Sequence, residues 1–495
     1  MNRRIFLHGL AALGVAPSLS AFASDAVLPQ EPAWALGFAS MNEDQLSSGT
    51  LPAVGKFPQA LRGILYRNGP ARHERGGLRY HHWFDGDGMV HAYRFGAQGV
   101  SHHARYVHTE KYLDEEQAGR FKRAAFGTIF PGSVPTTSAD SVNVANTSVL
   151  FHADTLLALW EGGSAYRLDA ETLDTLGKKT WREDLAGMPF SAHPKIEPDG
   201  TLWNFGTISR KNMLAIYRIS ASGALQKAQI IPVPHMPMVH DFAITERHLV
   251  FLLPPFNIDS QRLASGDSIA QSYVWEPQRG MRILTVDKND FAKTRMYETD
   301  SGFVFHLGNA WEDAQGVIRL SYLRSDDDAS FQLGFDVMRG VFDANRARPH
   351  LSLMRLDPQT GRVSEEKMPE VSEFPSIDSR HVGRRYRHIV TICNRPGKAD
   401  FGFDMVQRRD LERGTVDQYH YGADVLAEEH ILVPDLSRRV EGAGWVVGTS
   451  LDLKKKTTTL SVFDALKLGD GPVAQAYLPY ALPLGLHGMF RRQIA

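Results

Sequence analysis

The densest group of chemically active side chains in the sequence is HHWFDGDGMVHAY, residues 81–93. It holds three histidines and two aspartates, which are ligands that metals use in proteins. As a calcium loop it fails: an EF-hand starting at Asp85 needs an acidic residue or Asn fifth and Gly sixth, where Met89 and Val90 stand. Strand-like residues flank the Asp-Gly pairs, and Asp-Gly between strands is typical of a hairpin turn. We therefore predict a tight hairpin whose histidines are not metal ligands.

Composition narrows the other kinds of chemistry. The 495 residues carry a net charge of −1 and a pI of about 7.1, so charge gives no case for binding nucleic acid or an anionic membrane surface. The one cysteine, Cys393, excludes an intrachain disulfide and a cysteine-based zinc or iron–sulfur site. No Gly-rich fingerprint follows a strand, so neither nicotinamide nor flavin is expected.

Many short strands must position whatever site the chain carries. β-Branched and aromatic runs recur beyond Ser24, for example at 155–162, 200–208 and 445–453. A strand ending in an Asp-led turn, RLDAET at 167–172, recurs as RLDPQT at 355–360. Such repetition, without a Pro- or Ser-rich linker, favours a single β-propeller domain over residues 24–495. The one candidate for a long amphipathic helix is residues 115–130.

Residues 1–23 are predicted to be an export signal rather than part of the fold. Arg3 and Arg4 precede an apolar run from Ile5 to about Val15, and small residues follow at Ala21 and Ala23. The arginine pair favours a twin-arginine signal over an ordinary secretory signal. We therefore expect a mature protein in the bacterial periplasm. No later segment has 18 uninterrupted apolar residues, the length of a membrane span.

Five motifs carry a resemblance to a known family. YRNGP at 66–70, followed by HWFDGDGMVH at 82–91, resembles the N-terminal signature of the carotenoid cleavage oxygenases, which include stilbene-cleaving dioxygenases. Four further segments match the family's histidine motifs in order: SAHPK at 191–195, VHDFAITE at 239–246, FHLGNAWE at 305–312 and GLHGMF at 485–490. The resemblance runs from about residue 50 to the C-terminus. It implies an all-β fold, a seven-bladed β-propeller with a helical and loop cap over an iron centre on its axis.

The resemblance also implies the residues of that centre. Four histidines from different blades would hold one Fe2+: His193, His240, His306 and His487. Three glutamates would accept the outer ring N–H groups of histidines: Glu161, Glu373 and Glu429. Glu428 is an alternative to Glu429, and alignment on Val433-Pro434 prefers Glu429. O2, the co-substrate, would use the remaining metal positions. Thr147 matches a small residue beside one of these and would limit access sterically.

The family cleaves a carbon–carbon double bond with O2 and gives two carbonyl products. Carotenoids and apocarotenoids need an apolar, aromatic tunnel, whereas stilbene cleavers often carry a Lys before the glutamate that matches Glu161, where it can stabilise a phenolate. Here that residue is Trp160, which can line an apolar wall. The resemblance therefore favours an apolar polyene substrate, with stilbene cleavage as the alternative.

Three further expectations stay open at this point. A non-catalytic carotenoid-binding propeller would be expected to lack a histidine or supporting glutamate, and none is missing. An isomerase using the same iron fits an export signal less well. Because carotenoids reside in membranes, the helix predicted at 121–130, with Phe126, Phe130 and the neighbouring Arg120, Lys122 and Arg123, would either contact a membrane or pack as a cap helix.

Overall fold

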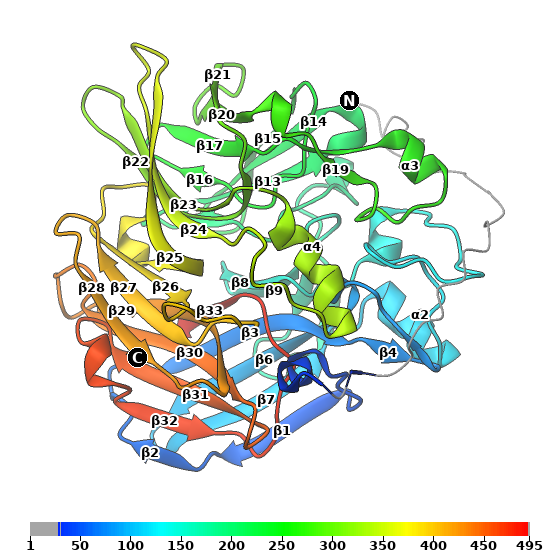
Figure 1. Cartoon of the computed structure of the whole chain (residues 1–495), viewed down its shortest axis with the longest axis vertical. Coiled ribbons are helices and arrows are strands. Elements are labelled where there is room, and N and C mark those ends of the chain that lie inside the picture. Colours follow the sequence, from blue (N-terminus) through cyan, green and yellow to red (C-terminus); the bar gives the residue numbers. More distant parts are fainter. Residues whose placement is uncertain (1–27, 30, 494–495) are drawn as a thin grey trace.

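The strands of the protein form a ring of blades in the computed structural model, which describes residues 28–29 and 31–493 (Figure 1). The predicted export signal lies outside these residues. The first blade holds β8 (Ser148–His152), β9 (Thr155–Leu159), β10 (Tyr166–Leu168) and β11 (Thr175–Lys178). The second holds β12 (Lys195–Ile196), β13 (Leu202–Ile208), β14 (Met213–Ile219) and β15 (Leu225–Pro232). The third holds β16 (Ala243–Ile244), β17 (His248–Leu253), β20 (Met281–Asp287) and β21 (Thr294–Thr299).

The fourth and fifth blades are halves of one sheet that share the long strand β25 (Val363–Ile377). The fourth adds β22 (Phe303–Glu312), β23 (Ile318–Ser325) and β24 (His350–Leu356). The fifth adds β26 (His388–Cys393), β27 (Met405–Asp410) and β28 (Val416–His420). The sixth blade holds β29 (Val425–Pro434), β30 (Gly444–Asp452), β31 (Thr457–Asp464), β32 (Ala474–Tyr477) and β2 (Ala53–Gly55).

The seventh blade closes the ring by joining both ends of the chain. It holds β1 (Gln45–Thr50), β7 (Gly99–Tyr106), β6 (Asp87–Gly96), β3 (Gly63–Arg72) and the C-terminal β33 (Gly488–Arg492). β33 pairs antiparallel with β3 and sets Gly488 opposite Arg67. The predicted seven-bladed propeller is thus confirmed, and its closing strand begins directly after a predicted metal ligand, His487.

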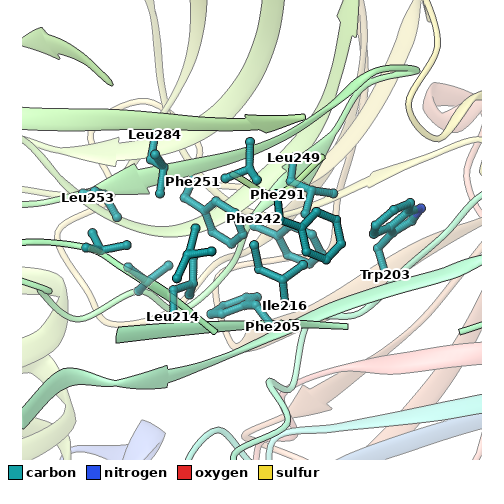
Figure 2. Close-up of a cluster of buried hydrophobic side chains, with 14 of the residues drawn as sticks. Trp203, Phe205, Leu214, Ile216, Phe242, Leu249, Phe251, Leu253, Leu284 and Phe291 are labelled. Atoms are coloured by element: carbon teal, nitrogen blue, oxygen red, sulfur yellow. The ribbon is translucent and has the colours of Figure 1, made fainter. Parts of the chain in front are cut away.

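Aromatic side chains pack the blades against one another. Between the second and third blades, Phe242 stacks on Phe251 with ring centroids 5.4 Å apart, and Phe205 meets Phe242 edge-on at 5.1 Å (Figure 2). Each such buried aromatic pair stabilises the fold by about 1 kcal/mol beyond the contribution of its buried area.

At the strand ends, Asp169 and Asp357 each accept two backbone N–H groups from the residues that follow, as the repeated Asp-led turns predict.

The predicted hairpin at residues 85–88 is wrong. Residues 83–85 form a single 3-10 turn, and β6 begins at Asp87 and pairs with β3 and β7. The hairpin of this region comes earlier, where β4 (Glu74–Arg75) and β5 (Leu78–Arg79) turn at Gly76-Gly77. Glycine is needed in the motif for close approach, because a Cβ at Gly88 would lie 2.3 Å from the carbonyl oxygen of Ala145.

Buried partners explain why the two aspartates of this motif do not turn the chain. Asp85 accepts hydrogen bonds from the Gly127 N–H at 2.8 Å and the Thr128 hydroxyl at 2.6 Å. Asp87 pairs with the buried Lys111 at 2.9 Å. The motif therefore ties the propeller to the cap segment around residues 110–130.

The cap holds three short helices, α2 (Glu110–Ala118), α3 (Ser260–Ala264) and α4 (Ala329–Asp336), and α4 lies across the middle of the ring (Figure 1). The predicted helix over 115–130 is wrong. α2 ends at Ala118, and Gly119 takes a left-handed φ of 63° beyond it. The carboxylate of Glu115 then accepts the backbone N–H groups of Lys122 and Arg123 and turns the chain back. No helix in the described residues is long and apolar enough to cross a membrane.

Candidate metal centre

Four histidine side chains meet at the centre of the ring, from the second, third, fourth and seventh blades. His306 lies in β22, the first strand of its blade. The other three lie one to three residues before a strand: His193 before β12, His240 before β16 and His487 before β33. One ring nitrogen from each lies within 4.8 Å of all the others. The structure therefore brings together all four histidines that the sequence motifs predict, across gaps in the chain that no local pattern joins.

Three carboxylates hold the outer nitrogens of these rings. Nδ1 of His306 lies 2.6 Å from Glu373, and Nδ1 of His487 lies 2.9 Å from Glu429. Nδ1 of His240 contacts Glu161. Each predicted glutamate thus faces one histidine, which fixes the tautomer and leaves Nε2 for a metal.

The inner nitrogens fit a shared metal ion. Nε2 of His193 lies 2.9 Å from Nε2 of His240, and Nε2 of His306 lies 3.1 Å from Nε2 of His487. Where Nδ1–H donates to a carboxylate, Nε2 presents a lone pair, so the facing nitrogens repel unless a cation lies among them. Two imidazoles bound at right angles to one metal at about 2.1 Å have nitrogens about 3 Å apart. The donor set therefore could hold one metal ion of the kind that prefers imidazole.

Burial and neighbouring charges shift the pKa values of the cluster in both directions. Burial, and then the neighbouring histidines, hold the pKa values of His193 and His487 well below the ordinary range, so both rings are neutral at neutral pH. For His240, burial alone would lower the pKa, but the carboxylates of Glu161, Asp241 and Glu373 together outweigh it and the pKa is raised. Burial raises the pKa of Glu429 to about 7.

A buried aspartate connects three of the ligand segments. Asp241, next to His240, lies 2.7 Å from Nζ of Lys195 and accepts the backbone N–H of Leu307 at 2.8 Å. Lys195 follows His193 by two positions, and Leu307 follows His306. The sequence motifs contain Asp241 and Lys195, but their role was not predicted, because an ion pair between distant motifs leaves no local signal.

A buried arginine positions the fourth ligand. Arg67 donates to the carbonyl of Glu429 at 2.8 Å and pairs with the carboxylate of Glu428 at 3.4 Å. Glu428 also accepts the N–H of Gly485 at 2.7 Å. The choice between the two glutamates is thereby clear in the geometry: Glu429 faces His487, and Glu428 anchors the segment that leads to it.

Phe374 is a further residue that the sequence did not indicate. Its ring centroid lies 5.3 Å from that of His306 and 5.2 Å from that of His487. Its backbone is left-handed, with φ of 53°, a strained conformation for a bulky residue. This backbone conformation places the ring against His306 and His487. The carboxylate of the preceding residue, Glu373, contacts Nδ1 of His306 at the same time.

The cluster opens on an apolar cavity of about 330 Å³. Trp83, Phe84, Phe126, Met238, Phe305 and Leu484 are among its lining residues, and α4 contributes part of its wall. Thr147 and Trp160 line it beside Glu161, as predicted. The Thr147 hydroxyl donates to the Asn146 side chain at 3.1 Å, so it is engaged away from the histidines. The arrangement can place a long apolar molecule beside a metal ion.

Comparison with known proteins gives close matches across nearly the whole chain. A family described as "Retinal pigment epithelial membrane protein" matches residues 38–492. Apocarotenoid-15,15'-oxygenase of Synechocystis is 31% identical over 449 residues, covering 88% of this chain and 91% of that protein. Lignostilbene-alpha,beta-dioxygenase isozyme III of Sphingomonas paucimobilis is 28% identical over 466 residues, covering 88% and 92%.

Solved structures agree with these sequence matches. A mutant of Synechocystis apocarotenoid oxygenase superimposes with a TM-score of 0.84 at 26% identity, covering 93% of this chain and 98% of that one. Solved mutants of that oxygenase change a threonine, a tryptophan or the glutamate after it, at the same sequence spacing as Thr147, Trp160 and Glu161 here.

Proposed function

The chain belongs to the retinal pigment epithelial membrane protein family, the carotenoid cleavage oxygenases, and we propose that it is a non-haem iron(II) dioxygenase of carotenoids or apocarotenoids. It would cleave one conjugated double bond with O2 and give two carbonyl products. The observation that carries this proposal is the opening of a four-histidine cluster onto an apolar, aromatic cavity.

The residues of the chain would divide the work as follows. The four histidines would hold Fe2+ through Nε2, and Glu161, Glu373 and Glu429 would keep their rings oriented. Iron(II), when bound by these histidines, would supply the redox chemistry that activates O2. Thr147 narrows access to the cluster by its bulk. The apolar cavity excludes water and presents one bond of an extended substrate to the cluster.

Trp160 supports the polyene class over stilbenes. A tryptophan in the wall next to Glu161 adds apolar surface and offers no cation to a phenolate. The greater identity to the apocarotenoid oxygenase than to the lignostilbene dioxygenase, 31% against 28%, points the same way.

The test is to incubate iron(II)-loaded protein with O2 and three substrates: β-carotene, an apocarotenal and resveratrol. We expect two carbonyl fragments from a polyene, identified by mass, and no turnover in His240→Ala. Cleavage of resveratrol alone would move the protein to the stilbene class. Full iron content and turnover in His240→Ala would contradict the four-histidine centre.

We further propose export to the periplasm and contact with a membrane. Phe130 is buried, whereas Ile129 and Val134 are exposed by 45% and 40% and lie close in sequence to the cavity-lining Phe126. The contact predicted through Phe126 and Phe130 is therefore proposed through Ile129 and Val134 instead. Ile129→Asp with Val134→Asp should reduce sedimentation with liposomes, whereas Val416→Asp, at a site 41% exposed on the fifth blade, should not. Equal binding by the wild type, the double variant and Val416→Asp would reject the contact.

Export is tested by fractionating cells that carry Arg3→Lys with Arg4→Lys, which should retain the protein in the cytoplasm.

A further inference from the structure

Within the described residues, the wall of the cavity holds one cation that has no carboxylate at ion-pair distance. Two arginines line the cavity, Arg346 and Arg348. Arg346 is exposed and pairs with Asp336 at 2.8 Å. Arg348 is half-buried, and in the part of the chain that the structure describes no carboxylate lies within 4.0 Å of it.

Neutral groups hold the Arg348 guanidinium in place. Nη1 donates to the carbonyl of Lys398 at 3.4 Å, and the guanidinium carbon lies 5.3 Å from the ring centroid of Phe342. With the Asn394 amide turned so that its oxygen faces the arginine, Nη1 and Nη2 both donate to that oxygen. Phe342 also lines the cavity. A guanidinium has five N–H donors in a rigid plane, and these contacts engage Nη1 twice and Nη2 once, so N–H groups remain that can donate to an anion.

One carboxylate, that of Asp404, acts on Arg348, and it lies beyond ion-pair distance. Lys398 is buried; burial lowers its pKa, and the positive charges of Arg395 and Arg348 add to this effect against the carboxylates of Asp404 and Asp400. The carboxylate that acts on both cations, Asp404, lies 3.5 Å from Arg395 and accepts its backbone N–H at 3.0 Å. A half-buried cation without a paired anion lowers the stability of the folded protein, because burial removes part of its hydration. An anion that binds to it offsets this loss.

Strand β25 connects this group to the metal centre. The N–H of Ser372 donates to the carbonyl of Pro349, next to Arg348, at 2.9 Å. The next residues on the strand, Glu373 and Phe374, contact the histidines. Arg348 and three of the histidines therefore line the same cavity, and a short path through Pro349 and β25 joins them. Val371, on the same strand, lines the cavity beside them.

We propose that Arg348 binds a carboxylate at the end of the substrate, so that the protein selects polyene carboxylic acids, apocarotenoic acids, over the corresponding alcohols and hydrocarbons. This inference rests on the proposed function for its substrate class. The bidentate pair of guanidinium and carboxylate fixes the polyene lengthwise. Only bonds at a fixed distance from the carboxylate then face the histidines, which line the same cavity.

Binding is measured without turnover, by quenching of tryptophan fluorescence in the absence of O2, with an apocarotenoic acid and the alcohol of the same chain length. We expect the wild type to bind the acid more tightly. Arg348→Gln should weaken binding of the acid by about 10- to 100-fold, the effect of losing a hydrogen-bonded charge, and leave the alcohol unchanged. Arg348→Lys should recover part of the loss. Arg362→Gln, which removes one exposed positive charge from the same blade, is the matched control.

The outcomes separate this inference from the function it rests on. Equal affinity of the wild type for acid and alcohol, or an equal loss for both ligands in Arg348→Gln, would overturn the carboxylate site. If Arg348→Gln does not fold, the preference of the wild type and of Arg348→Lys for the acid decides the matter. Selective binding of the acid without cleavage by iron-loaded protein would keep the site and reject the dioxygenase. Cleavage of polyenes by a protein that binds acid and alcohol equally would keep the dioxygenase and reject the carboxylate site.

Discussion

Replacing Arg67 by Met should damage both the stability of the propeller and its metal centre. Arg67 is 4% exposed and joins β3 to the Glu428 carboxylate and the Glu429 carbonyl. Methionine keeps the apolar stem of the side chain but leaves Glu428 as a buried carboxylate without a cation. Breaking a buried pair from one side costs about 3–5 kcal/mol.

That cost converts into a shift in melting temperature. Unfolding entropy is about 2.1 cal/mol/K per residue, which gives about 1 kcal/mol/K for a chain of this length. Arg67→Met should therefore lower Tm by about 3–5 °C. Because the segment before His487 loses its anchor, iron affinity should also fall by about 10-fold.

Calorimetry of iron-free protein and anaerobic iron titration measure the two effects. The matched control is Arg94→Met on the same sheet, whose pair with Glu171 is largely exposed and worth at most about 1 kcal/mol. The double variant Arg67→Met with Glu428→Gln should recover a large part of the lost stability, since no buried charge is then left over. A Tm for Arg67→Met within about 1 °C of wild type, with unchanged iron affinity, would refute the role given to this pair.

Three further predictions concern other parts of the molecule. Glu373→Gln removes the charge that faces His306, so anaerobic titration should show iron affinity about 10- to 100-fold lower, and unchanged affinity would contradict its orienting role. Burial raises the pKa of Asp85 from 3.8 to about 6, so the folded state binds more protons than the unfolded state between about pH 4 and 6. The free energy of unfolding therefore falls as pH rises through this window, by up to about 3 kcal/mol. Asp85→Asn should remove this contribution. If Tm depends on pH in the same way for the wild type and Asp85→Asn, the assignment is refuted. Gly88→Ala would set a Cβ 2.3 Å from the carbonyl oxygen of Ala145 and should lower Tm by several degrees. Gly49→Ala is the control, because a Cβ there has open space and should leave Tm unchanged. Equal Tm values for the two variants would show that the backbone shifts to accommodate the Cβ at residue 88.

The four histidines could be predicted from the sequence only through the residues around them. The gaps between them are 47, 66 and 181 positions, so no helix or loop period connects them, and the ring is what brings them together. The supporting network could not be predicted in the same way. The pair of Lys195 with Asp241 joins two motifs through space, and the left-handed Phe374 precedes Pro375, a position that favours extended backbone.

The two local predictions that failed did so for different reasons, one through distant contacts and one through a local stop signal. The Asp-Gly pairs suit a hairpin, but Asp85 and Asp87 are taken by Thr128 and Lys111, which lie 43 and 24 residues further along. The helix predicted over 115–130 contains a glycine at its fifth position. Gly119 is a helix-stop signal in its own right, so this error could have been avoided from the sequence.

The most direct test of the central claim is anomalous diffraction at the iron absorption edge from crystals of iron-loaded protein. We predict one strong peak per chain, within bonding distance of Nε2 of His193, His240, His306 and His487. A peak at another site, or none between these nitrogens in crystals of protein that binds iron in solution, would contradict the account.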